Sequence, residues 1–451
     1  MPDRKPARKL IGELADSFTE LPFLDRTSTE ADGPIGWAGY DEARLRAAER
    51  TGEDESVVCG TGDVGGVTAL LVVFEFGFLG GSLGRRTGAR IDAAFDHAVR
   101  QGLPVVTAVA TGGSRMQEGM AALAQLQRIA AAAARVRAAG LPQVAVLRDP
   151  TTGGGWATLG AGADVTLAVP GAQVGFAGSR VRPAGDDDAV AAYTAEGQFA
   201  GGHVDRLVSP ENLPGTLASW LRLLTARRGG APDLPRALGV RTEPDSGWAA
   251  VRAARAEQRP RAGAYLDDYF DHREDISGDR CGGGVDQTVA CGFGSRAGQV
   301  IAYAAQCGTA TTAPGFRTAA RLIRLADRLG IPVLTLVDTP GAANDAAAER
   351  AGVGGAIAEV FAAVASARVP VSTLVIGEGG SGGALAFAAA GRTWMTPDSY
   401  FSVTSPEAAA SILKRDPGEV PATADQLRLR PTDVVALGVA EGIVPHAVTC
   451  T

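Results

Sequence analysis

Two glycine-rich stretches hold the residues whose types and spacing could do chemistry. The first, "DPTTGGGWATLGAGAD", runs from Asp149 to Asp164, and the second, "IGEGGSGGALAFAAAG", runs from Ile376 to Gly391. Each follows a valine-rich run and precedes small residues, which predicts a turn between a buried strand and a helix. The first amides of a helix lack carbonyl partners and carry partial positive charge, so such a turn can hold an oxygen anion.

Glycine suits this role because a Cβ would block a ligand from the backbone and because glycine tolerates positive φ. The plain alternative is that these glycines only allow close helix packing. Other readings fit less well: no Lys-Ser/Thr pair follows the second stretch as in a P-loop, and no G-x-G-x-x-G lies in a short βαβ unit. There is no G-x-S-x-G nucleophile turn either, and we interpret Ser381 as a small spacer.

The neighbourhoods of the two stretches match each other in order. "GLPVVTAVATGG" from Gly102 matches "GIPVLTLVDTPG" from Gly330, and "GLPQVAVLRDPTTGG" from Gly140 matches "ARVPVSTLVIGEGGSGG" from Ala367. An offset near 228 residues holds across both motifs. The sequence therefore predicts an internal duplication, with one glycine turn in each copy. Matched turns in two copies favour the anion-binding interpretation over packing alone.

Each copy alternates short valine-rich runs with long alanine-rich segments that carry charges at helical spacing. This pattern predicts an α/β fold with parallel strands and right-handed crossovers. We expect an N-terminal extension at 1–35, one domain at 36–228, a linker and helix at 229–262 and a second domain at 263–451. The Pro- and Gly-rich stretch "RRGGAPDLPRALGVRTEPDSG" marks the linker.

Composition restricts the partners and the compartment. The 451 residues, 45% of them hydrophobic, allow two cores, and a net charge of −7 argues against nucleic acid or an anionic membrane surface as the main partner. The five cysteines show no metal-binding or disulfide spacing, which favours a reduced, cytoplasmic protein. The opening segment lacks the features of a secretory signal, and no apolar run has the pattern expected of a membrane-spanning helix.

Longer motifs resemble a known enzyme family. The N-terminal half resembles the β subunit of bacterial acetyl-CoA carboxylase carboxyltransferase through "FGFLGGSLGRRTGARI", "ATGGSRMQEGMAALAQLQR" and "LPQVAVLRDPTTGGGWAT". The C-terminal half resembles the α subunit through "YLDDYFDHREDISGDR", "PGFRTAARLIRLADRLGIPVLTLVDTPGA" and "IGEGGSGGALAFA". The resemblance covers roughly residues 35–446. It implies a fusion of both subunits, with two tandem crotonase-like (ββα superhelix) domains.

The activity implied is transfer of a carboxyl group between carboxybiotin and the α-carbon of an acyl thioester of the acetyl-CoA/malonyl-CoA type. The biotin would arrive on a separate biotinyl carrier protein that a biotin carboxylase loads. Related enzymes place the acyl-CoA on the N-terminal half and the biotin on the C-terminal half of an antiparallel partner, which implies a homodimer or a higher homo-oligomer. No side-chain base is required, because the biotin enolate left after CO2 release can take the α-proton.

The resemblance also implies the site residues. The amides of Gly153 and Gly154 would hold the thioester oxygen, and those of Gly382 and Gly383 would hold the ureido oxygen of biotin. The remaining substrate-binding candidates are Gly112, Gly113, Arg115, Arg180, Gly341 and Ala342. The two arginines could contact CoA or the thioester, with local ion pairs as the alternative, and Glu118 is expected to pair with Arg115.

The sequence departs from the family pattern in three places. The four-cysteine zinc ribbon of the β subunit is missing, so no metal is expected. The basic insertion of the α subunit is replaced by "CGTATTAPGFR", and the residues after "DTPGA" are replaced by "ANDAAAERAG". A decarboxylase of malonyl-type thioesters and an inactive scaffold homologue therefore remain as alternatives. The acyl group, the CoA or carrier-protein form of the thioester, the reaction direction and the oligomer size stay open.

Overall fold

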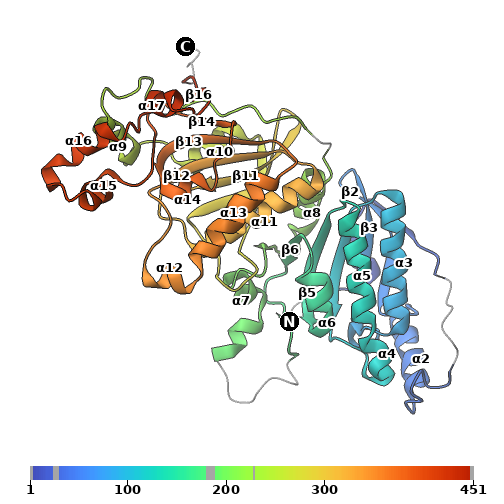
Figure 1. Cartoon of the computed structure of the whole chain (residues 1–451). Helices are drawn as coiled ribbons and strands as arrows, with labels where there is room; N and C mark the ends of the chain where they lie inside the picture. Colours follow the sequence, from blue (N-terminus) through green and yellow to red (C-terminus); the bar gives the residue numbers. More distant parts are fainter. Residues whose placement is uncertain (1–3, 24–29, 179–187, 227–228, 447–451) are drawn as a thin grey trace. The chain divides into compact units, whose positions relative to one another are not determined.

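The computed structural model describes residues 4–23, 30–178, 188–226 and 229–446, and the chain divides into two compact units. Unit 1 comprises Met1–Thr225 and unit 2 comprises Ala226–Thr451. Each unit is a parallel-rich sheet covered by helices, as the predicted α/β class requires (Figure 1).

Unit 1 contains one sheet with strand order β1-β2-β3-β4-β5-β6-β8, and β7 pairs with the far end of β5. β1, β2 and β3 are antiparallel, and the pairs from β3 onward are parallel. The strands are β1 Ser17–Glu20, β2 Val57–Val64, β3 Val67–Phe74, β4 Val105–Thr111, β5 Gln143–Thr152, β6 Val165–Ala168, β7 Val174–Gly175 and β8 Arg206–Leu207.

The helices of unit 1 are α1 Ala7–Leu14, α2 Tyr40–Thr51, α3 Arg85–Gln101, α4 Gly119–Leu123, α5 Gln125–Ala138, α6 Gly153–Gly155, α7 Ala195–Ala200 and α8 Leu213–Leu224. Short 3-10 turns lie at Leu79–Gly81, Met116–Glu118 and Asp188–Tyr193, and a π turn at Trp156–Gly160 extends α6. The expected extension at 1–35 is not separate, because β1 is an edge strand of this sheet.

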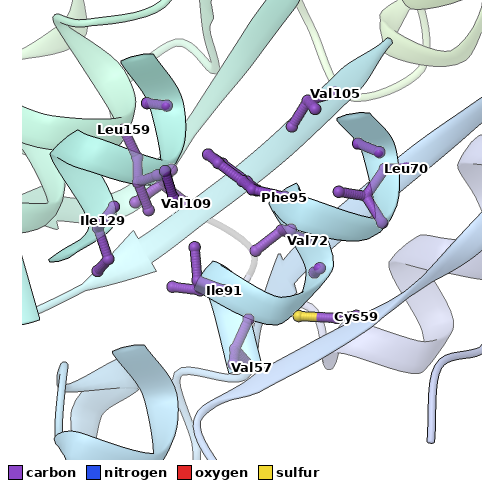
Figure 2. Packing of buried hydrophobic residues seen from close by; sticks show 14 of the residues in the cluster. Val57, Cys59, Leu70, Val72, Ile91, Phe95, Val105, Val109, Ile129 and Leu159 are labelled. Carbon is purple, nitrogen blue, oxygen red and sulfur yellow. The ribbon is translucent and has the colours of Figure 1, made fainter. Parts of the chain in front are cut away.

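The core of unit 1 lies between the sheet and helices α3 and α5. Ile91 and Phe95 of α3 recur at helical spacing and pack with Ile129 of α5 against Val72 and Val105, as Figure 2 shows. All of these side chains are buried. The packing of these helices on the sheet holds strand β5 in place, and the first glycine turn begins where β5 ends.

Unit 2 repeats this topology with strand order β9-β10-β11-β12-β13-β14-β16, and β15 pairs with the far end of β13. The strands are β9 His272–Ile276, β10 Val289–Arg296, β11 Gln299–Gln306, β12 Val333–Thr339, β13 Val371–Gly380, β14 Thr393–Met395, β15 Tyr400–Ser402 and β16 Gly442–Ile443.

The helices of unit 2 are α9 Gly247–Arg255, α10 Ala262–Tyr269, α11 Ala313–Leu329, α12 Ala346–Arg350, α13 Val353–Ser366, α14 Ser381–Leu385, α15 Pro406–Ile412, α16 Val420–Gln426 and α17 Pro431–Ala436, with a 3-10 turn at Pro417–Glu419. The bounds of α11, β12, α13 and β13 equal those of α3, β4, α5 and β5 displaced by 228 residues. The expected linker region 229–262 contributes α9, which belongs to unit 2.

Candidate active site

The glycine turn of unit 1 begins where β5 ends. Gly153 has φ +61°, a conformation that favours glycine, and it opens α6. A Cβ at Gly154 would lie 2.3 Å from Cδ2 of Leu126, and one at Gly155 would lie 2.3 Å from Cγ2 of Thr111. Glycine here therefore also serves close packing of α6 against β4 and α5, so the two interpretations of these residues are compatible.

The amides of this turn are not equivalent. The Gly153 N–H donates to the carbonyl oxygen of Phe176 at 3.1 Å, which corrects the prediction that this amide holds a substrate oxygen. The Gly154 N–H lies in the first turn of α6, where no helix carbonyl is within reach. Gly154 therefore stays a predicted donor, and Gly153 supplies the turn geometry.

The loop after β4 lies against this turn. A Cβ at Gly153 would be 3.2 Å from Cα of Gly113, which itself has φ +107°. The Gly113 N–H donates to Oγ1 of Thr111 at 3.0 Å, and the Gly112 N–H donates to the carbonyl of Gly80 at 2.9 Å. These two glycines shape the wall beside the turn with amides that are already bonded.

Ser114, the next residue of this loop, was not among the candidates predicted from the sequence. Leu83 N–H donates to the Gly113 carbonyl, and Arg115 N–H donates to the Leu83 carbonyl, both at 2.9 Å, which pairs Leu83 with Ser114 in a parallel bridge. Leu83 bonds to the residues on either side of Ser114, so the N–H of Ser114 itself points away from Leu83. The Ser114 N–H is thus a second candidate donor next to Gly154.

Unit 2 builds an equivalent turn at the end of β13. Ser381 has φ +58° and occupies the position of Gly153, so a serine adopts the left-handed conformation there. Gly382 is exposed, and a Cβ added to it would meet nothing within 4 Å. Gly383 is buried, and its Cβ would lie 2.5 Å from N of Ala342. Gly382 and Gly383 lie in the first turn of α14, where amides lack helix partners.

The loop after β12 mirrors the loop after β4. Gly341 has φ +139°, and its N–H donates to Oγ1 of Thr339 at 3.1 Å. Thr311 N–H donates to the Gly341 carbonyl at 3.0 Å, and Ala343 N–H donates to the Thr311 carbonyl at 2.9 Å, which pairs Thr311 with Ala342 in a parallel bridge. The structure thus places Gly341 and Ala342 beside the second turn, and the Ala342 N–H corresponds to that of Ser114.

The side chain of Arg115 is engaged in buried local ion pairs, the alternative to the substrate contact assigned to it from the sequence. Its side chain is fully buried and forms an ion pair with Glu55, whose Oε1 lies 2.5 Å from Nη2. It also contacts Oε1 of Glu118 at 3.4 Å and the hydroxyl of Tyr40 at 3.1 Å, so the expected pairing with Glu118 is confirmed. Arg115 instead anchors the loop that carries Gly113 and Ser114. Arg180 lies outside the described residues.

Unit 2 holds its turn with arginines that the sequence analysis assigned to a linker. Buried Asp338 of β12 accepts from Nη2 of Arg259 at 2.5 Å and from Nη1 of Arg261 at 3.4 Å. Glu378 of β13 accepts from Nε of Arg255 at 2.7 Å, and its own N–H donates to Asp338 at 3.1 Å. Acids inside apolar strands must find buried partners, and that signal in "TLVDTPG" and "VIGEGG" could have revealed these contacts.

Among the described residues, no group of three or more His, Cys, Asp or Glu side chains is arranged to hold a metal ion. In the same ranges, no helix has the length and apolar character needed to cross a membrane.

Comparison with known proteins identifies the family. The family "Carboxyl transferase domain" matches residues 37–201, and "Acetyl co-enzyme A carboxylase carboxyltransferase-like" matches residues 244–451. The acetyl-coenzyme A carboxylase carboxyl transferase subunits beta/alpha of Salinispora arenicola is 39% identical over 98% of this chain and 82% of its own length. The chain belongs to this family of fused biotin-dependent carboxyltransferases.

Other relatives agree with this assignment. A probable biotin-dependent acyl-coenzyme A carboxylase beta3 subunit of Mycobacterium bovis is 35% identical over 90% of the chain and 83% of its own length. Among solved structures, a transcarboxylase 12S subunit aligns with TM-score 0.80 at 20% identity, covering 98% of this chain and 87% of that one. At this identity the structure supports the fold, with two crotonase-like domains.

Proposed function

We propose that the chain transfers a carboxyl group between carboxybiotin, presented by a separate carrier protein, and the α-carbon of an acyl thioester. The observation that carries the proposal is the pair of equivalent glycine turns, each with first-turn amides beside a loop that adds one more amide, that of Ser114 or Ala342, facing away from its bridge partner. In this assignment, Gly154 and Ser114 of unit 1 serve the thioester oxygen. Gly382, Gly383 and Ala342 of unit 2 serve the ureido oxygen of biotin.

The residues of unit 2 fit a ring that must approach the backbone closely. Gly382 is exposed, and no remote atom of the chain lies within 4 Å of its Cβ position, so a ligand could approach the backbone on that side. Biotin supplies the carrier nitrogen on which the carboxyl group travels. The chain supplies fixed amide donors, each of which stabilises developing negative charge on oxygen by about 3 kcal/mol in comparable sites. Positioning and backbone electrostatics thus carry the catalysis.

The proposed partners are a biotinyl carrier protein, a biotin carboxylase and a second copy of this chain that completes the active site. In this proposal the biotin arrives on the carrier protein. The transcarboxylase structure is described as a hexamer assembly. We further propose a cytoplasmic location, as the cysteine pattern indicates, which cell fractionation tests.

In this proposal the second copy contacts the chain at two exposed apolar residues, Phe176 and Val403. Phe176 is 73% exposed beside the first turn, and Val403, the equivalent residue after β15, is 74% exposed beside the second. Large exposed apolar side chains at functional sites are typical of interfaces. Phe176→Glu and Val403→Glu are expected to lower both the oligomer mass measured by sedimentation and the carboxyl-transfer activity. Val240→Glu, at an exposed valine in another segment, is the control. An unchanged oligomer mass in both test variants would contradict the proposal that these two residues lie in the interface.

The function is tested with the purified chain, malonyl-CoA and biocytin. The expected products are carboxybiocytin and acetyl-CoA, and methylmalonyl-CoA and carrier-bound thioesters are run in parallel to define the acyl group. Decarboxylation that persists with avidin in place of free biotin would favour the decarboxylase alternative. Binding of known carboxylase subunits without turnover of any thioester would favour a scaffold and contradict the proposal.

A further inference from the structure

Gln306, the last residue of β11, is a buried side chain bonded to the α14 turn and to Thr311, which lies between β11 and α11. It is 0% exposed, and its Nε2 donates to the carbonyl oxygen of Gly383 at 3.0 Å and to Oγ1 of Thr311 at 3.2 Å. An amide side chain held by two acceptors has one orientation, since its NH2 group must face both of them. Gln306 therefore links the α14 turn to the segment before α11.

The Gly383 carbonyl depends on this contact. In a regular α-helix it would accept from the N–H of Phe387, four residues later. In α14 the Phe387 N–H instead donates to the Ala384 carbonyl at 3.1 Å, while the Ala386 N–H donates to the Gly382 carbonyl at 3.0 Å. The helix tightens after one turn, and Gln306 supplies a donor for the Gly383 carbonyl. A buried carbonyl without a donor would be costly.

The same glutamine reaches the second loop through two threonines. Thr311 Oγ1 donates to Oγ1 of Thr339 at 3.4 Å, and Thr339 Oγ1 contacts the Gly341 carbonyl at 2.7 Å. The backbone of Thr311 also brackets Ala342 in the parallel bridge. The two sets of candidate amides, on α14 and at Ala342, therefore share one buried polar network that includes Gln306.

Unit 1 has no glutamine at the position that corresponds to Gln306. The last residue of β3, which corresponds to β11 in the repeat, is Phe74, a buried apolar side chain that cannot donate. There the loop after β4 is anchored by the Arg115 ion pair instead. The glutamine contact is thus a property of the half-site assigned to biotin, not a general requirement of the duplicated fold.

We propose that Gln306 is a positioning residue that orients the α14 amides toward the biotin ureido oxygen. This inference rests on the proposed function. In Gln306→Met the side chain keeps similar length and loses both donated hydrogen bonds, so the turn can rotate. We expect kcat/KM for biocytin to fall at least tenfold, with the KM for malonyl-CoA within twofold of wild type.

The chain offers a matched control. Gln143, at the start of β5 and 6% exposed, donates from Nε2 to the Ala133 carbonyl at 3.0 Å, at the opposite end of the strand from Gly153. Gln143→Met removes a comparable buried contact and should lower the melting temperature similarly while leaving kcat/KM for biocytin unchanged. Equal kinetic losses in both variants, or none in Gln306→Met, would overturn the inference.

Hydrogen–deuterium exchange separates this inference from the proposed function. Gln306→Met should speed exchange at least tenfold in peptides covering 381–387, and Gln143→Met should not. If wild type transfers no carboxyl group, the proposed function and the orientation toward biotin fail together, while faster exchange in Gln306→Met would still show that Gln306 holds the α14 turn in place. Unchanged exchange at 381–387 overturns that role whatever the activity.

Discussion

Gly382→Ala is expected to reduce carboxyl transfer at least about 100-fold while leaving thermal stability unchanged or slightly higher. The added methyl group meets no atom of the chain within 4 Å and φ is not positive, so the fold accommodates it. Alanine is also the better helix former by roughly 1 kcal/mol. In the proposed site the methyl group stands beside an amide that holds an oxygen anion, so it would keep the ligand from that donor, and losing one such donor costs about 3 kcal/mol.

The measurement pairs biocytin-dependent turnover of malonyl-CoA with a melting curve. Gly355→Ala is the matched control, because Gly355 also lies in the first turn of a helix, α13, is exposed and has open space at its Cβ position. It should raise stability by a similar amount and keep full activity. Wild-type turnover in Gly382→Ala would show that no ligand approaches this amide.

The fold was largely predictable because its signals are local and occur twice. Valine-rich runs ending at glycine predict the strands, and the repeat predicts that both units share one topology, as they do down to the β-bulge near the end of β4 and of β12. The repeat also located both glycine turns. What it could not show is which amides are free, since the bond from Gly153 to Phe176 follows from pairing of β7 with β5.

The role of Arg115 was beyond sequence reasoning for a related reason. Its neighbour Glu118 was predicted from helical spacing, but Glu55 and Tyr40 lie 60 and 75 residues away. An arginine beside a glycine loop has the same local sequence whether it faces substrate or a buried carboxylate. Likewise, Pro- and Gly-rich composition suggested a linker at 229–262, and only the tertiary contacts show Arg259 and Arg261 meeting Asp338.

Arg115→Met is expected to destabilise unit 1 by about 3–5 kcal/mol. The guanidinium and the Glu55 carboxylate are both inaccessible to solvent, so removing the cation leaves a buried charge without a counterion. The same change frees the loop that carries Ser114, so acyl-CoA turnover should fall as well. Urea denaturation followed by hydrogen exchange of unit 1 peptides measures the loss of stability.

Arg128→Met provides the comparison. Arg128 pairs with Asp92 at 2.7 Å, but its side chain is 46% exposed, and such surface pairs contribute at most about 1 kcal/mol. The double variant Arg115→Met/Glu55→Met should recover part of the lost stability, because it removes the uncompensated carboxylate too. A loss below about 1 kcal/mol in Arg115→Met would mean that the buried pair contributes no more than a surface pair.

The pH dependence of the same pair gives an independent test with a defined sign. Burial alone would raise the pKa of Glu55, but the Arg115 charge and hydrogen bonds outweigh it and lower the pKa from 4.5 to about 2. In wild type the ionised Glu55 carboxylate contributes fully to the unfolding free energy above pH 4.5, and this contribution is lost as the pH falls toward 2. In Arg115→Met the Ser56 N–H bond and the Arg86 charge still favour the carboxylate, but burial, the largest influence, is no longer opposed by Arg115. The pKa of Glu55 therefore rises, and protonation of its carboxylate relieves part of the penalty. The difference in unfolding free energy between wild type and variant should therefore narrow on acidification from about pH 7 to about pH 4, whereas a simple packing defect would leave it constant.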